Sequence, residues 1–131
     1  MKALFAAALA LLVYVSPSMA CNFNQHVIHQ AQMMVIHDIY PDDIGQVGPA
    51  WAVIDKLAIE YCARRSEATF TPHVQLVIEF KQFLSRDYKQ VYKHACRSVN
   101  KCIDTFALWT RDKWVREDKV EAARLELQKR E

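Results

Sequence analysis

Four basic side chains recur at four-residue intervals in the segment KQVYKHACRSVNK, residues 89–101; they are Lys89, Lys93, Arg97 and Lys101. Residues four apart on an α-helix lie on one face, so this spacing predicts a basic ridge. Like charges at that spacing repel, so helix stability does not explain the ridge. Its candidate chemistry is contact with an acidic protein or another anionic surface. The competing interpretation is a solvated helix face, or one that faces acidic residues of the same chain.

Charge is distributed unevenly along the chain. Residues 21–60 contain five acidic residues and one lysine, whereas residues 61–101 contain eight basic and three acidic residues. The whole chain has a formal charge of only +2, which argues against a nucleic-acid-binding protein. The basic middle of the chain is therefore the part in which we expect an anionic partner to bind.

Histidines offer weaker candidates for chemistry. His26 and His29 are three residues apart, a spacing that suits two metal ligands on one helix, but no third ligand is specified. A His–Asp pair involving His37, His73 or His94 has no accompanying nucleophile motif. We therefore predict no catalytic residue, no metal site and no cofactor, and an enzyme remains the third interpretation.

A carrier of a small apolar ligand is the alternative to surface recognition. Methionine side chains adapt to irregular apolar ligands, and aromatic residues at core spacings can complete such a cavity. The candidate lining residues are Met33, Met34, Trp51, Phe80 and Phe83.

Residues 1–20 resemble a secretory signal peptide, with a basic start, an apolar run and small residues before Cys21. We expect cleavage there and secretion of residues 21–131 as a single domain, with lipidation of Cys21 as a rival outcome. No later apolar run reaches the roughly 18 residues that a membrane span needs. The four cysteines of an exported chain then predict two disulfides, formed by Cys21, Cys62, Cys96 and Cys102.

Helical periodicity and only two glycines indicate an all-α fold. We expect helices over residues 23–40, 49–65 and 72–98, and a last helix from about residue 101 into the charged C-terminal segment. Pro49 and Pro72 are expected in first helical turns, with residues 40–49 as a loop. A break at residues 85–87 would give five helices instead of four. The predicted fold is a small antiparallel bundle of four or five helices, stapled by two disulfides.

The disulfide pairing depends on that break. A continuous helix over residues 72–98 is about 40 Å long, which keeps Cys62 away from Cys96 and requires Cys21–Cys62 and Cys96–Cys102. A chain that reverses at residues 85–87 allows Cys62 to pair with Cys96 or Cys102. We favour the first pairing.

The leading functional hypothesis is a secreted helical binding protein that recognises an extracellular protein or anionic surface through the basic ridge.

Overall fold

The computed structural model describes residues 21–86 and 95–130, so the expected signal peptide lies outside the described residues. These two segments contain four α-helices and two short turns of other helix types, and no strand. In chain order they are α2 (Gln25–Met34), the π-helical turn η2 (Val35–Ile39), α3 (Ile44–Arg64), α4 (Pro72–Arg86), the 3-10 turn η4 (Ala95–Arg97) and α5 (Val99–Arg130). The predicted all-α fold with two disulfides is confirmed.

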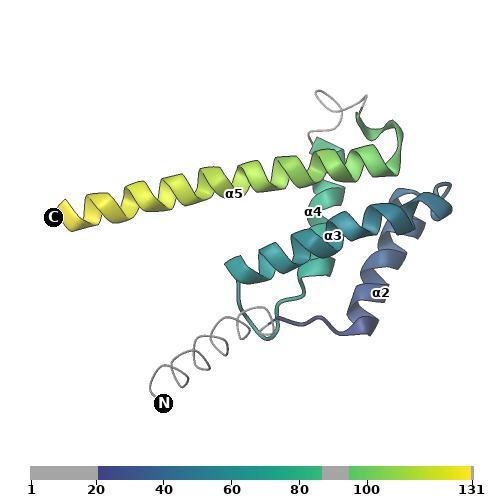
Figure 1. Cartoon of the computed structure of the whole chain (residues 1–131), viewed down its shortest axis with the longest axis horizontal. Coiled ribbons are helices and arrows are strands. Elements are labelled where there is room, and N and C mark those ends of the chain that lie inside the picture. Colours follow the sequence, from purple (N-terminus) through teal and green to yellow (C-terminus); the bar gives the residue numbers. More distant parts are fainter. Residues whose placement is uncertain (1–20, 87–94, 131) are drawn as a thin grey trace, which may run out of the picture.

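Helix α3 is central to the packing, because it contacts both α4 and α5, while α2 packs against α4. Figure 1 shows α3 and α5 running alongside one another, with α2 and α4 crossing them steeply. The C-terminal half of α5, yellow in Figure 1, extends well beyond the other helices. No helix in the described segments combines the length and apolar composition needed to cross a membrane.

Aromatic side chains from α4 and α5 form the centre of the core. Phe80 and Phe106 are fully buried and Phe83 is nearly so, and their ring centroids lie 5.1–6.3 Å apart. Helix α3 contributes Ile54 and Leu57, which are also fully buried. Each such side chain stabilises the fold by about 1.5–3 kcal/mol, so this cluster holds the three helices together.

The start of α3 differs from the prediction, because residues 44–48 are helical and Pro49 lies inside the helix. Proline lacks the N–H that would bond to the carbonyl four residues earlier, so a proline this deep is normally unfavourable. Packing outweighs this loss, since Val47 and Ala50 on either side of Pro49 are 3% exposed. The expected loop is therefore confined to the residues before Ile44.

Helix α4 begins as predicted at Pro72, and the Thr71 carbonyl accepts the first helical hydrogen bond from Gln75 N at 3.0 Å. The expected continuation as one helix to residue 98 is wrong. Cys96 belongs to η4, with non-helical φ −93° and ψ 23°. It also lines the same groove as Leu84, from which a continuous helix would separate it by about 18 Å. Residues 87–94 lie outside the described part of the chain.

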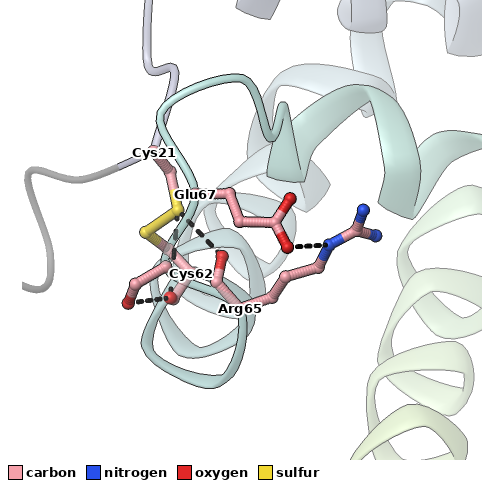
Figure 2. Close-up of a disulfide and its surroundings, with 5 residues drawn as sticks. Cys21, Cys62, Arg65 and Glu67 are labelled. Atoms are coloured by element: carbon pink, nitrogen blue, oxygen red, sulfur yellow. Dashed lines mark hydrogen bonds and ion pairs between the residues drawn. A yellow bond between two sulfur atoms is a disulfide. The ribbon is translucent and has the colours of Figure 1, made fainter.

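Both disulfides have the favoured pairing, although the continuous helix that favoured it is absent. Cys21–Cys62 ties the segment before α2 to the end of α3, beside the loop that carries Arg65 and Glu67 (Figure 2). Asn22 N donates to the Phe70 carbonyl at 2.8 Å, which also joins the segment before α2 to the loop between α3 and α4. Cys96–Cys102 joins η4 to the first turns of α5, with Cα atoms 4.1 Å apart.

Candidate binding surface

Two members of the predicted basic ridge, Arg97 and Lys101, lie at the turn from η4 into α5 and are exposed. We call this pair the basic corner. Ser98 caps α5 between them: its hydroxyl accepts from Lys101 N at 3.3 Å and its carbonyl from Cys102 N at 3.0 Å. Cys96, Val99 and Cys102 are buried, so the local fold anchors the backbone inward and leaves both cations in solvent. Lys89 and Lys93 lie outside the described residues.

The basic corner does not have the geometry of a single helical ridge. Arg97 ends η4, Lys101 lies in α5, and the chain bends at Ser98 between them. The four-residue helical spacing that predicted the ridge therefore does not apply across this turn. The two cations are instead held near one another by the disulfide between Cys96 and Cys102.

Ion pairing distinguishes Arg97 from the other arginines whose side chains the structure describes. The others each lie within 4.0 Å of a carboxylate, in the pairs Arg64–Asp118, Arg65–Glu67, Arg111–Glu60, Arg116–Asp112, Arg124–Glu121 and Arg130–Glu126. Within the described part of the chain, neither Arg97 nor Lys101 has such a partner. The first turn of α5 also has no acidic residue, so both cations add to the positive end of the helix dipole. The corner thus combines two cations with no carboxylate partner from residues 21–86 or 95–130.

The acidic residues of the first half do not neutralise the corner. Asp38 pairs instead with Lys81 of α4, at 3.6 Å. Glu60 receives two hydrogen bonds from Arg111, of 3.1 and 2.7 Å, and these raise the pKa of the Arg111 guanidinium. Gln46 near the start of α3 meets the α5 end through Asn100, at 3.4 Å, a neutral contact.

The five residues predicted to line an apolar cavity are in or against the core. Trp51 stacks on His73 with ring centroids 5.9 Å apart, while Phe80 and Phe83 pack on each other and on Phe106. Met33 and Met34 are half-buried. A groove of about 440 Å³ at the junction of η2, α4 and η4 contains none of the five; it is lined by Asp38, Ile39, Tyr40, Lys81, Leu84, Ser85 and Cys96. The carrier hypothesis stays a prediction.

His73, which the sequence indicated only as one of three candidates, is buried and pairs with the exposed carboxylate of Asp55. Its Nε2 lies 2.8 Å from Asp55 Oδ1, and its ring is 3% exposed between Trp51 and Phe23. The two residues lie on adjacent helices 18 positions apart, a separation that no local motif reveals. Aromatic packing on both sides of the ring is typical of a structural histidine. No metal-binding cluster of three or more His, Cys, Asp or Glu residues occurs in segments 21–86 and 95–130.

A second polar cluster, which the sequence did not suggest, joins α3, α4 and α5. Burial, followed by the nearby Glu79 carboxylate, raises the pKa of Tyr61 to about 12. Lys113 Nζ lies 3.7 Å from Glu79 Oε1, and the neighbouring Arg64 donates hydrogen bonds of 2.9 Å to both Asp118 carboxylate oxygens. The acids and bases here compensate one another, so this cluster joins helices rather than presenting an unpaired charge.

Comparison of the chain with protein-family models, curated proteins and solved structures finds no match.

Proposed function

We propose that this chain is an exported binding protein that recognises an anionic extracellular surface or acidic protein through the basic corner, Arg97 and Lys101. The observation that carries this proposal is that Arg97 has no carboxylate partner among the described residues, whereas six other arginines have one. An exposed guanidinium can form two parallel hydrogen bonds to a carboxylate, sulfate or phosphate group. Lys89 and Lys93, close by in the sequence, would enlarge the same contact.

Rigid positioning supports the same proposal. Two buried half-cystines and a serine cap hold the backbone between Arg97 and Lys101. A partner that binds there therefore orders two side chains but little backbone, which lowers the entropic cost of binding. Export agrees with the two disulfides, since such bonds persist in oxidising compartments.

Chromatography on a sulfated-polysaccharide resin tests the proposal; the measured quantity is the salt concentration at which the protein elutes. The double variant Arg97→Gln and Lys101→Gln should elute at clearly lower salt than the unmodified chain. The matched control carries Gln25→Glu and Gln30→Glu, two exposed positions of α2, and changes the net charge by the same amount. Equal elution of the two double variants would show that only total charge matters and would refute a localised site.

The carrier hypothesis has less support, because Trp51, Phe80 and Phe83 already contact other rings of the core. A fluorescent fatty-acid probe provides its test. Saturable binding of one probe per chain, unaffected by salt and by the Arg97→Gln and Lys101→Gln pair, would favour a carrier over surface recognition.

A further inference from the structure

Helix α5 carries a line of exposed apolar side chains that no other described element covers. Leu108, Val115 and Ala122 follow one another at seven-residue intervals and therefore lie along one side of the helix. Leu108 is 69% and Val115 51% exposed, and Ala122 is exposed as well. We call residues 119–130, which lie beyond the last α3 contact at Asp118, the α5 tail.

A groove of about 520 Å³ runs beside this line, between α3 and α5. Ala52 and Val53 of α3 and Ala107 and Leu108 of α5 make it apolar, and its charged lining residues are Lys56, Asp104 and Arg111. Ile59, one helical turn after Lys56 on α3, is 55% exposed and extends the apolar surface along the groove. This apolar groove is suited to binding one more helix.

The tail of the same molecule cannot extend its own core. The buried face of α5, which includes Phe106, Thr110 and Trp114, continues beyond Trp114 as four polar residues, Glu117, Glu121, Arg124 and Gln128, with only Leu125 as a large apolar side chain on that face. The apolar line through Ala122 lies on another side of the helix. Within residues 21–86 and 95–130 nothing of the same chain covers it, which leaves it open to a partner.

We propose that this partner is a second copy of the chain, with the two α5 helices antiparallel and each tail seated in the groove of the other copy. A two-fold axis between Asp118 and Lys119 makes the interface self-complementary, as a closed dimer requires. In that register residue 130 lies opposite Ala107 of the second copy. The 12 tail residues, about 18 Å of helix, thus lie opposite residues 107–118, which include Ala107, Leu108 and Arg111 of the groove lining.

Charge complementarity selects this register. Arg111, which also pairs with Glu60 of its own chain, then faces the second copy's Glu126, and Asp118, which also pairs with Arg64, faces its Lys119. Val115 lies opposite Ala122, while the alkyl stem of Lys129 covers Leu108. A shift of one helix by seven residues, in either direction, still leaves the two apolar lines facing one another. One such shift places Arg111 opposite the second copy's Lys119, and the other places Asp118 opposite its Glu126. Like charges that face one another across a helix interface are unfavourable, so both shifted registers are weaker.

The groove explains Leu125 as well. This side chain lies one turn after Ala122, on the side of the tail that faces α3 of the second copy, level with Ile59. Leu125 is 46% exposed in the single chain. Contact between Leu125 and Ile59 turns a two-helix contact into one of three helices, α5 with the tail and α3 of the other copy. Each dimer contains this arrangement twice.

Molar mass by light scattering, measured on the disulfide-bonded chain over a range of concentrations, tests the proposal. We expect a dimer that dissociates on dilution. Ala122→Arg places a long cation in the centre of the interface and should yield only monomer, with unchanged circular dichroism. Ala123→Arg is the matched control, because residue 123 lies about 100° around the helix and should leave the dimer intact. A monomer at every concentration, or equal effects of the two variants, would overturn the proposal.

Cross-linking tests the register. Chains with Val115→Cys, mixed with chains carrying Ala122→Cys and oxidised, should form a disulfide-linked heterodimer. Val115→Cys alone should form no such link, because its two copies are separated by about 10 Å along the helices. A link in that sample, or none in the mixture, would refute the register. Arg97→Gln with Lys101→Gln should not change the molar mass, so this proposal and the proposed function can fail separately.

Discussion

The two halves of α5 form one helix but are held by different forces. Residues 99–114 bury seven side chains against α3 and α4, whereas residues 115–130 are all exposed. The exposed half has local ion pairs instead, such as Arg124–Glu121 at 2.6 Å and Arg130–Glu126 at 4.0 Å. Such a pair stabilises a helix by about 0.2–0.5 kcal/mol, whereas burial of one large apolar side chain contributes about 1.5–3 kcal/mol. Packing therefore determines the stability of the first half, and the second half should fray first in an isolated chain.

The largest effect should come from the packed half. Phe106→Ala removes a fully buried ring that contacts Phe80, Phe83 and Trp109, and should lower the free energy of unfolding by about 3–5 kcal/mol. Denaturant unfolding measures this loss. Val120→Ala, which truncates a side chain that is 69% exposed in the other half, should change it by less than about 0.5 kcal/mol. Similar losses in both variants would show that the tail belongs to the core.

A smaller effect is expected at the start of the packed half. Replacing Cys96 and Cys102 by serine opens a short loop and should lower the free energy of unfolding by about 2 kcal/mol, against about 4 kcal/mol for the longer Cys21–Cys62 loop. Thermal unfolding of this double variant and of the corresponding Cys21 and Cys62 double variant shows which disulfide contributes more stability. If the Cys96–Cys102 variant were the less stable of the two, the disulfide would be holding more than the local turn.

The stability of the fold at alkaline pH reports on the point where α5 leaves the core. The ring centroids of Tyr61 and Trp114 lie 5.2 Å apart there. Burial raises the pKa of Tyr61 from 10.0 to about 12, so the folded state favours the neutral phenol. The corresponding stability is complete below pH 10 and is lost as the pH rises from 10 to 12. Tyr61→Phe should remove this part of the alkaline decline, which chemical denaturation at several pH values measures. An unchanged slope between pH 10 and 12 would contradict the shift.

The smallest effect should be confined to the tail. Hydrogen bonds from Arg124 lower the pKa of the Glu121 carboxyl, so Glu121→Gln removes an ion pair that exists only in the helical form. The free energy of global unfolding should stay the same, because the side chain is exposed. Amide hydrogen exchange of residues 119–130 should nevertheless become faster, while that of residues 99–114 stays the same. Faster exchange in both halves would mean that they unfold together.

The helices were predictable where local signals and packing agree. Pro72 marks the start of α4 because proline suits a first helical position and Thr71 accepts the first bond, both local effects. The predicted helix start at Pro49 was wrong for the opposite reason. The helix begins earlier, at Ile44, because Val47 and Ala50 are buried in the core, and no local sequence rule contains that information. The disulfide pairing was correct, but its premise of a continuous helix failed at Cys96, which has non-helical dihedral angles in the 3-10 turn η4.

The candidate site was predictable only as a set of residues. The spacing of the basic residues pointed to Arg97 and Lys101, but it implied one helical face, whereas a capped turn separates them. What distinguishes Arg97 among the described arginine side chains is that the six others have partners. Five of those partners lie on α3 or α5, at distances set by the fold or by helical spacing; they are Asp118, Glu60, Asp112, Glu121 and Glu126. Pairs such as Arg64–Asp118, 54 positions apart, are invisible before the helices are placed.

The uninterrupted length of α5 has a consequence for avidity. In the antiparallel dimer each Lys101 lies near a far end of the paired helices, about 50 Å from its counterpart at 1.5 Å of rise per residue. A straight rigid spacer of this kind presents two basic corners at a fixed separation. Multivalent binding gains most when the spacing of the sites matches that of the target, so the dimer would favour surfaces whose anionic groups recur at about that interval over isolated ones.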